Sequence, residues 1–494
     1  MSRLDELCAE ALSREASQPA IEFEHRWFAW GELRHVADRL GAALHACGAP
    51  GEPPVALVAR NRPSAIAALL GLIARRRTVR MMYAFQSPAA LARNLGQLGP
   101  AVLVAAADDL SAEVRATMRA LGGAAIALTE MDASAVPGLE RAHPRTAGLD
   151  VPEPAIEILT SGTTGPPKPF ALSYELIARH HVGAAAGDGA QLTPTLLYFP
   201  LGNITGIYSS LPALLRGQRA LLLERFSVAG WHDYVLRFRP EASGLPPAGV
   251  QMVLEADIPP ADLASIKRLG TGAAPLEPAV HRAFEERYGI PILLSYGATE
   301  FGGPVTAMTL ELHAVWGRKK FGSVGRALPG VQLRVLDPDT DEVLRPGCEG
   351  ILEAVSPRIG PRWIRTSDIA LIDEDGFVFH RGRADGAIMR GGFKLLPESI
   401  ERILMSHPAV SAAAVVGIPD PRLGQVPAAA IRLRPGSARP DAGELESHLR
   451  RHLLATHIPA AWRFVDELPR TASFKIDRPA LRALFESGSP VQSD

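Results

Sequence analysis

The sequence predicts an α/β protein: a large N-terminal domain of helix-covered sheets, a small β subdomain that completes it, and a small α+β C-terminal domain. Three changes of pattern along the chain lead to this expectation. Up to about residue 380, apolar strand-like runs alternate with amphipathic helices, which is typical of parallel sheets covered by helices. From residue 321 the strand-like runs become short and are separated by Gly and Pro. After residue 383, short amphipathic helices alternate with strands.

Length and charge agree with several domains and exclude some partners. The chain has 494 residues, more than one hydrophobic core normally organises, so at least two domains are expected. Lysine and arginine number 52 against 53 acidic residues, for a formal net charge of −1. No overall field therefore favours binding to nucleic acid or to an anionic membrane.

The N-terminus and the cysteines indicate the compartment. Residues 1–7 open a polar amphipathic helix rather than a signal peptide, and the longest apolar run, 65–74, is too short to span a bilayer. The three cysteines are odd in number and lack the spacing of metal ligands, which fits a reducing environment. We therefore expect a soluble, cytoplasmic protein with no membrane span.

The strand-like run 155–159 leads into a loop, residues 160–168, that is suited to holding phosphate. Its glycines permit backbone angles that let successive N–H groups converge on an anion, its hydroxyls add donors, and its lysine adds a mobile positive charge. These residues are Thr160, Ser161, Gly162, Thr163, Thr164, Gly165 and Lys168. The prolines around Lys168 exclude the spacing of a Walker loop. A polar surface turn is the alternative interpretation.

A predicted helix over 277–288 is followed by a predicted strand over 292–296. This strand brings the segment from Tyr296 to Glu300 to its C-terminal end, where open α/β sheets bind their ligands. Shorter strands over 332–336 and 350–355 are expected to form the β subdomain.

The C-terminal region is predicted to form a compact α+β domain. One helix covers 397–404, and Leu445, Leu449 and Leu453 recur every four residues in another. Strands are expected over 410–418, 428–433 and 462–465, and the polar tail 486–494 is expected to be disordered.

Five motifs occur in a fixed order along the chain. The first is the phosphate loop, and the others are Ser295-Tyr296-Gly297-Ala298-Thr299-Glu300, Trp363-Ile364-Arg365-Thr366-Ser367-Asp368, Gly382-Arg383-Ala384-Asp385, and the segment 469–478 that contains Lys475. Together they resemble the adenylate-forming superfamily of acyl-CoA ligases, peptide-synthetase adenylation domains and luciferases. The resemblance extends over roughly residues 20–480.

The resemblance implies ATP, Mg²⁺ and coenzyme A as ligands. The phosphate loop, Thr160 to Gly165 with Lys168, would cradle the β- and γ-phosphates. Thr299 would donate to the α-phosphate and Glu300 would bind Mg²⁺. Taken alone, Glu300 could equally be an ordinary exposed carboxylate.

The same resemblance implies residues for the nucleoside and for the reacting groups. Gly272, Ala273 and Tyr296 would bind adenine, and Asp368 with Arg383 would bind the ribose. Lys475 would bridge the substrate carboxylate and the α-phosphate, stabilising charge mainly in the transition state. The alternative interpretations are a core tyrosine, a structural aspartate and a solvated lysine.

A hinge is implied at Asp385, where the change of sequence pattern also suggests a boundary. We therefore expect an N-terminal ATP- and acyl-binding domain at 1–381, a hinge at 382–386 and a mobile C-terminal lid domain at 387–494. Gly391 and Gly392 would line the coenzyme A tunnel, although a plain interdomain loop would also contain such glycines.

Several residues depart from the family pattern. Pro169, Ser367 and Phe474 stand where the family has glycine, and Asn203 stands where ligases often have histidine or an aromatic gate. Met389 replaces a lysine that many relatives use in thioester formation.

The expected acyl pocket is formed by Phe199, Asn203, Thr205 and Tyr208. Amino-acid-activating relatives have Phe-Asp at this place, whereas here Phe199 is followed by Pro200. The wall is mildly polar and largely apolar, which favours an aryl or aliphatic carboxylic acid over an α-amino acid.

The sequence thus predicts an ATP-dependent acid–thiol ligase that forms acyl-AMP and transfers the acyl group to coenzyme A. One alternative is transfer to the phosphopantetheine of an acyl or aryl carrier protein acting in trans. Another is a non-catalytic homologue that binds a nucleotide or an acyl ligand, suggested by Phe474, Met389 and Ser367.

Overall fold

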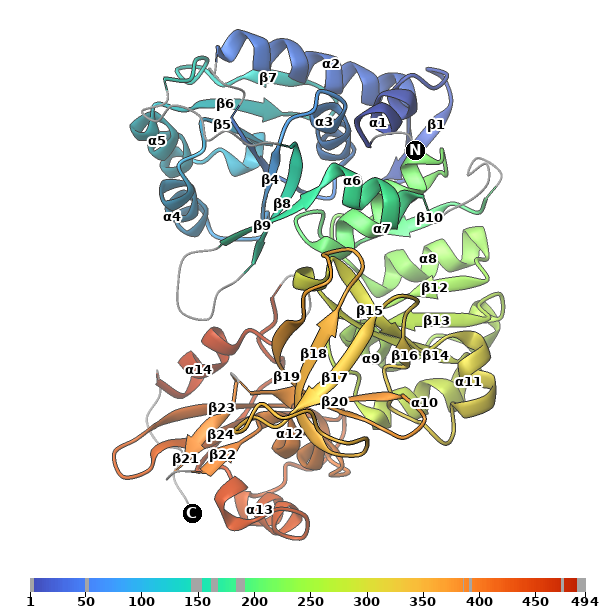
Figure 1. Ribbon diagram of the computed structural model, residues 1–494, viewed down its shortest axis with the longest axis vertical. Coiled ribbons are helices and arrows are strands. Elements are labelled where there is room, and N and C mark those ends of the chain that lie inside the picture. The colour runs from blue at the N-terminus through green and yellow to red at the C-terminus, as the bar shows by residue number, and fades with distance from the viewer. Residues whose placement is uncertain are drawn as a thin grey trace. The chain divides into compact units, whose positions relative to one another are not determined.

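A computed structural model describes residues 4–48, 53–143, 153–160, 168–183, 192–384, 386–390, 393–471 and 475–486 (Figure 1). The chain forms two compact units, Met1–Pro240 and Glu241–Asp494. Helices and strands alternate as expected, so the predicted α/β class is confirmed. The domain boundaries around residue 385 stay a prediction. Among the described residues, no helix is both long and apolar enough to cross a bilayer.

The first unit is built on a seven-stranded sheet in the order β7-β6-β5-β3-β4-β8-β9. Its inner strands run parallel, and the edge strands β7 and β9 pair antiparallel. The strands are β3 (Val55–Val58), β4 (Val79–Met82), β5 (Val102–Ala106), β6 (Ala124–Leu128), β7 (Ala133–Ala135), β8 (Ala155–Thr160) and β9 (Lys168–Ser173).

Both faces of this sheet are covered, which explains why β3 and β5 are apolar at every position. Val55 and Leu57 of β3 belong to one core cluster, and Ala56 and Val58 belong to the opposite one. The helices that supply residues to the first cluster include α1 (Leu4–Leu12), α2 (Trp30–Cys47) and α3 (Pro63–Ala74). Two others supply the second: α4 (Pro88–Leu98) and α5 (Ala112–Leu121).

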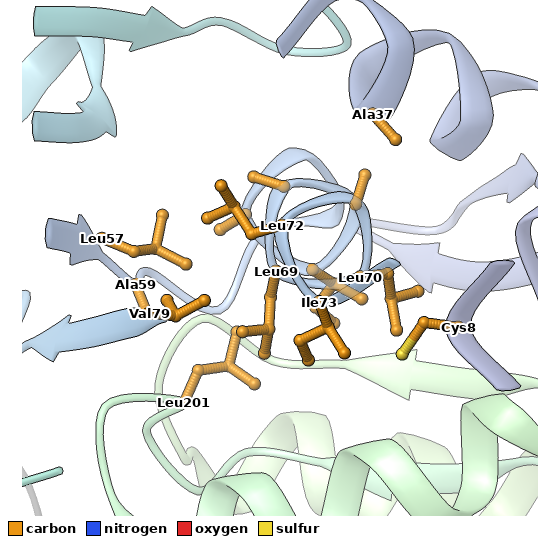
Figure 2. Close-up of a cluster of buried hydrophobic side chains, with 14 of the residues drawn as sticks. Cys8, Ala37, Leu57, Ala59, Leu69, Leu70, Leu72, Ile73, Val79 and Leu201 are labelled. Carbon is orange, nitrogen blue, oxygen red and sulfur yellow. The ribbon is translucent and has the colours of Figure 1, made fainter. Parts of the chain in front are cut away.

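Helix α3 is at the centre of this packing, and Figure 2 shows its side chains meeting those of the sheet and of neighbouring helices. All its residues from Pro63 to Ile73 are buried. An added Cβ on Gly71 would lie 2.8 Å from the Cβ of Ala37, so the small residue lets α2 and α3 approach closely. Cys8 and Cys47 lie in the same core with free thiols, and burial raises the pKa of both.

The rest of the first unit forms a four-stranded sheet in the order β10-β11-β1-β2 and the helices beside it. The strands are β1 (Pro19–Phe23), β2 (Arg26–Ala29), β10 (Thr195–Leu197) and β11 (Ala220–Leu222). The helical segments are Ala107–Asp109, α6 (Tyr174–Ile177), a π-helical turn over Ala178–Val182, α7 (Ile204–Leu215) and α8 (Val228–Phe238).

The second unit begins with a five-stranded sheet in the order β12-β13-β14-β15-β16 and continues into the predicted β subdomain, an antiparallel sheet in the order β17-β18-β19-β20. The strands are β12 (Ala242–Gly244), β13 (Arg268–Thr271), β14 (Ile292–Ala298), β15 (Gly303–Ala307), β16 (Arg326–Ala327), β17 (Gln332–Leu336), β18 (Glu349–Val355), β19 (Ile364–Ile372) and β20 (Val378–Arg383). The helices are α9 (Pro247–Glu255), Pro260–Leu263, α10 (Pro278–Tyr288), Thr299–Phe301 and α11 (Leu310–Trp316).

The C-terminal part of this unit has the predicted α+β pattern. Its sheet has the order β22-β21-β24-β23, and β25 pairs with β24. The elements are β21 (Ile388–Arg390), β22 (Phe393–Leu395), α12 (Pro397–Met405), β23 (Val410–Asp420), β24 (Gly424–Leu433), α13 (Ala442–Arg450), Ala455–His457, β25 (Ala461–Phe464) and α14 (Arg478–Glu486).

Candidate functional site

Parallel strands β13 and β14 end beside each other and carry two of the predicted nucleotide motifs. At two glycines near these strand ends, Gly272 and Gly297, there is no room for a side chain. A Cβ on Gly272 would lie 2.8 Å from the carbonyl oxygen of Ser295, and one on Gly297 would lie 2.5 Å from the Cα of Pro304. The side-chain Oγ of Ser295 also obstructs at Gly272, at 2.6 Å, but backbone atoms obstruct at both positions, so these glycines allow neighbouring strands to approach closely.

The turn after β13 has two features that fit a bound ligand. Ala273 adopts a left-handed backbone with φ of 66°, a conformation that costs a residue with a Cβ about 1–2 kcal/mol. The hydroxyl of the buried Thr271 has no hydrogen-bond partner within the described part of the protein. A strained backbone and an orphaned polar atom occur together where the sequence predicts contact with adenine.

Tyr296, at the end of β14, and the buried Asp368, on β19, form a polar cluster with His380 on β20; Tyr296 and His380 are half-buried. The hydroxyl of Tyr296 donates to Oδ2 of Asp368, and Nε2 of His380 lies 3.3 Å from Oδ1. The backbone N–H of Asp368 donates to the hydroxyl of Thr366 at 2.9 Å. Both carboxylate oxygens therefore have partners, which fixes the orientation of the side chain.

Opposing effects act on this carboxyl group. Burial favours the neutral form of Asp368, but the contacts with His380 and Tyr296 and the nearby charge of Arg383 favour the ionised form, so its pKa lies below the ordinary value. Burial, followed by the charge of Asp368, raises the pKa of Tyr296. The pair therefore consists of a neutral phenol donor and a carboxylate acceptor.

Ser367, which departs from the family pattern, orients Arg383 in the structure. Arg383 is the register partner of Asp368 across β19 and β20. Its guanidinium donates to the hydroxyl of Ser367 at 2.7 Å. The serine that replaces the family glycine therefore supplies an acceptor that holds Arg383 beside Asp368.

Lys475 lies where the chain doubles back on itself. Arg470 pairs with Ile476, and the N–H of Thr471 donates to the carbonyl of Lys475 at 2.8 Å, so these contacts define the base of a hairpin. The residue is open to solvent, yet desolvation and repulsion by Arg383 lower the pKa of its ammonium, opposed by attraction to Glu300 and Asp368. The structure thus brings Lys475 into the electrostatic range of three predicted site residues from other motifs.

Thr299 and Glu300 lie in the short helix Thr299–Phe301 that follows β14, with Thr299 half-buried and Glu300 exposed. Within the described ranges no group of three His, Cys, Asp or Glu side chains could hold a metal. A single exposed carboxylate fits Mg²⁺, which proteins often bind through one or two carboxylates together with substrate phosphates and water.

The phosphate-loop residues belong to the first unit. Thr160 ends β8, Lys168 begins β9, and the two residues are register partners in the antiparallel pair. The loop between them therefore starts and ends on adjacent strands of the main sheet. Its inner residues, Ser161 to Gly165, lie outside the described residues, as do Asp385, Gly391, Gly392 and Phe474.

The four predicted acyl-pocket residues also lie in the first unit, all half-buried. Phe199 follows β10, Asn203 precedes α7, and Thr205 and Tyr208 lie on the first turns of that helix. An added Cβ on Gly206 would overlap the carbonyl of Pro200, so glycine is needed where the loop and helix cross. The ring of Tyr208 packs on that of His181, with centroids 4.3 Å apart.

Comparison with known proteins accounts for this combination of motifs. Residues 8–360 match the AMP-binding enzyme family, and residues 399–475 match the AMP-binding enzyme C-terminal domain. The chain belongs to the AMP-binding enzymes.

Relatives of this AMP-binding enzyme match along most of its length. It is 30% identical to a 2-succinylbenzoate–CoA ligase of Geobacillus kaustophilus over 74% of each chain. It is 29% identical to a sulfoacetate–CoA ligase of Cupriavidus necator over 91% of each chain. The ATP-bound structure of MatB from Rhodopseudomonas palustris shares the fold, with a TM-score of 0.80, 23% identity and coverage of 98% and 99% of the two chains.

Three residues that support the site of this AMP-binding enzyme were not among those expected from the sequence: His380, His181 and Asn61. A β-bulge between Ile369 and Ala370 shifts the register that places His380 against Asp368, and no spacing rule reveals such a shift. His181 reaches Tyr208 only through packing between helices. Asn61 had one available signal, because a polar residue shortly after a parallel strand often belongs to a site.

Asn61 fixes the loop that carries Phe199. It is 1% exposed, and its amide donates to the carbonyls of Phe199 and Leu223 at 3.1 and 3.2 Å. Its Oδ1 accepts from the N–H of Leu201 at 3.1 Å. A single buried amide therefore connects β3, the acyl-pocket loop and the segment after β11.

Proposed function

We propose that this AMP-binding enzyme is an ATP- and Mg²⁺-dependent acid–thiol ligase that activates a carboxylic acid and transfers the acyl group to coenzyme A. The single observation that carries the proposal is that Lys475 lies within electrostatic range of Glu300, Asp368 and Arg383, which come from three other motifs. Relatives that are CoA ligases support coenzyme A as the acceptor.

In the first step, a carboxylate oxygen of the acid attacks the α-phosphorus of ATP. The bond between the α-phosphorus and the bridging oxygen breaks, and pyrophosphate leaves. Lys475 places a cation where negative charge from both reactants accumulates, which stabilises the transition state more than the bound ground state. Glu300 would hold Mg²⁺, which would supply further charge neutralisation.

Residues of the second unit hold the nucleoside. Asp368 is oriented by Tyr296 and His380, so its carboxylate presents fixed acceptor positions suited to the ribose hydroxyls. Arg383, held by Ser367, is the second ribose contact. The turn at Gly272 and Ala273 contributes the adenine contacts, and the phosphate loop with Lys168 binds the outer phosphates.

In the second step, the sulfur of coenzyme A attacks the acyl carbonyl carbon. The bond to the adenylate oxygen breaks, the thiol proton passes to solvent, and AMP leaves. The predicted hinge at Asp385 and the glycines at 391 and 392 serve this step by reorienting the C-terminal domain. Because ATP and coenzyme A are both cytoplasmic metabolites, the reaction also suggests the cytoplasm as its location.

The acid is proposed to be an aryl or aliphatic carboxylic acid. Phe199 and Tyr208 offer aromatic surface, while Asn203, Thr205 and His181 add polar groups beside it. Such a wall suits an acid with an apolar body and one polar substituent, a description that includes 2-succinylbenzoate.

Pyrophosphate release across a panel of acids, with and without coenzyme A, tests the proposal. The panel contains 2-succinylbenzoate, sulfoacetate, simple aryl and alkyl acids, and amino acids as negative controls. We expect release with at least one non-amino acid and an acyl-CoA product when the thiol is present. If pyrophosphate is released but a thioester forms only after a carrier protein is added, the acceptor is the carrier protein and not coenzyme A. ATP binding without pyrophosphate release would favour a non-catalytic homologue.

Lys168→Ala provides a matched test of the nucleotide site. A lysine at the end of a loop has little packing to lose, so ATP use should weaken while the fold stays intact. Activity within a few-fold of the wild-type enzyme at low ATP would contradict the assigned role.

A further inference from the structure

Helix α9 contacts the C-terminal sheet through two residues one turn apart. The guanidinium of Arg432, on β24, forms a two-point contact with Glu255, with N···O distances of 2.9 and 3.0 Å. The amide of Gln251 donates to the carbonyl of Ser411, on β23, at 3.1 Å and to Oε1 of Glu255 at 2.9 Å. These contacts join residues that lie on opposite sides of residue 385 in the chain.

The interaction between Glu255 and Arg432 is more directional, and less screened by solvent, than that of an ordinary surface ion pair. Planar guanidinium and carboxylate groups that meet at two points restrict direction as well as distance. The side chains are 30% and 29% exposed, so solvent screens them less than a fully exposed pair. Gln251 further restricts the carboxylate of Glu255.

Glu255 does not stabilise the helix that carries it. It is the last residue of α9, where the negative end of the helix dipole disfavours an acidic side chain. The favourable interactions of this carboxylate therefore come from the cations that face it. Arg432 contacts it directly, and Arg470 lies within its electrostatic range: burial and repulsion by Arg432 lower the pKa of Arg470, and attraction to Glu467 and Glu255 opposes this.

Arg470 connects this contact to the catalytic lysine. It pairs with Ile476 at the base of the hairpin that carries Lys475. Strand β25 pairs with β24 and leads into the segment that carries Arg470 and Lys475, so holding β24 against α9 also restrains the base of the hairpin. Lys475 itself lies within electrostatic range of Glu300 and Asp368. A shift at the base would move the Lys475 ammonium away from the reacting atoms.

We propose that Glu255 and Arg432 are positioning residues that hold Lys475 in place for acyl-AMP formation. The inference rests on the proposed function, in which Lys475 acts in the first step and not in the second. The pair is not needed for thioester formation, because that step proceeds without Lys475.

Charge reversal separates this role from a merely structural one. Glu255→Arg places a third cation beside Arg432 and Arg470, while a basic residue suits the C-terminal end of α9. We expect acyl-AMP formation to slow about tenfold, the order of a well-formed charge pair. Thioester formation from supplied acyl-AMP should stay within about twofold of the wild-type rate.

The exchange of both charges tests whether the two residues act together. The variant Glu255→Arg/Arg432→Glu restores an ion pair with reversed polarity and should recover most of the lost acyl-AMP formation. The matched control is Glu446→Arg, which breaks the Glu446–Arg450 pair within α13, at 3.3 Å, and should change neither half-reaction. Thermal melts of every variant verify the fold.

The outcomes decide the proposal. Equal slowing of both half-reactions by Glu255→Arg, or no recovery in the folded double variant, would overturn it while the wild-type enzyme remains an active ligase. Absence of acyl-AMP formation by the wild-type protein would overturn the proposed function and, with it, this inference. If Glu255→Arg fails to fold, Arg432→Met supplies the same comparison, with the first half-reaction alone expected to slow.

Discussion

Tyr296 and Asp368 are joined by a hydrogen bond from the phenol to the carboxylate, although 72 positions separate them in the sequence. The bond connects the end of β14, which leads into Thr299 and Glu300, to the sheet that carries Arg383. The residue expected to contact adenine thus also orients the residue expected to bind ribose. Disturbing either side chain should affect the whole nucleoside.

Tyr296→Phe keeps the aromatic ring and removes only the hydroxyl. We expect the variant to lose about 1.5–3 kcal/mol of stability, the range for a hydrogen bond to a charged group, and the KM for ATP to rise. Loss of a contact that lowers the pKa of Asp368 should raise that pKa. The ionised form contributes its stability above the unfolded pKa of about 3.9, and this contribution is lost as the pH falls through the lower folded value. The Tm difference from the wild-type enzyme should therefore shrink in acid, and an unchanged difference would contradict the charge-assisted bond.

Gly297→Ala should destabilise the protein and impair ATP use. The added Cβ meets the backbone of Gly303 and Pro304, which flexible side chains cannot relieve, so a cost of about 1–3 kcal/mol is expected. Gly270→Ala is the matched control in the same sheet, because its Cβ meets only the carbonyl of Ser243 at 3.9 Å. Denaturant unfolding of both variants provides the comparison, and equal stability would show that the strand ends have room to separate.

The pH profile of acyl-AMP formation should show the lowered pKa of Lys475. The ammonium loses its proton as the pH rises through this value, which lies below the ordinary 10.4 or so for lysine. The rate constant should therefore decline on the alkaline side at a lower pH than an unperturbed lysine would give. Lys475→Ala should be slow and should lack this decline. A decline that persists in the variant would assign the titration to another group.

Asn61→Ala should affect use of the acid more than use of ATP. The substitution leaves the N–H of Leu201 and two carbonyls without their buried partner, at a cost of about 1–3 kcal/mol. The KM for the acid should rise because the loop carrying Phe199 loses its anchor, while the KM for ATP changes little. Asn94→Ala is the control, since that amide donates to the side chain of Gln86. A larger change in the KM for ATP would place Asn61 in the nucleotide site instead.

Asp385→Pro should have the opposite effect to Lys475→Ala. Proline fixes φ near −65°, so rotation at the predicted hinge should be obstructed while the arrangement for acyl-AMP formation stays accessible. Thioester formation from supplied acyl-AMP should slow, and acyl-AMP formation should persist. Lys475→Ala should show the reverse pattern, and a variant pair that loses the same half-reaction would leave domain rotation without support.

The sequence predicts elements well where periodicity and local chemistry agree. The helix α10 begins after Glu277 with Pro278 at its first position and ends before Gly289, and the strand β14 follows, as the pattern of proline, glycine and apolar residues indicates. Strands β23 and β24 are longer than expected, because Pro419 and Pro427 are tolerated within their pairing. The site motifs on Tyr296, Asp368, Arg383 and Lys475 do converge in one region of the second unit.

The sequence does not reveal contacts that depend on register or on packing between distant elements. Ser367 reads as a departure from the family, yet its hydroxyl holds Arg383. His380 faces Asp368 because of a bulge, and Glu255 meets Arg432 across 177 positions. Such partners follow from the three-dimensional arrangement of strands and helices, which local propensity does not encode.

The burial of two of the three cysteines makes the protein convenient for site-selective chemistry. Cys8 and Cys47 lie in the α3 core with raised thiol pKa values, so few thiolates form there and reagents have no access. Cys348, half-buried just before β18, is the thiol that a maleimide reaches first. A fluorophore attached there would sit on the sheet that carries Asp368 and Arg383, and nucleotide binding could be followed optically in the unmutated enzyme.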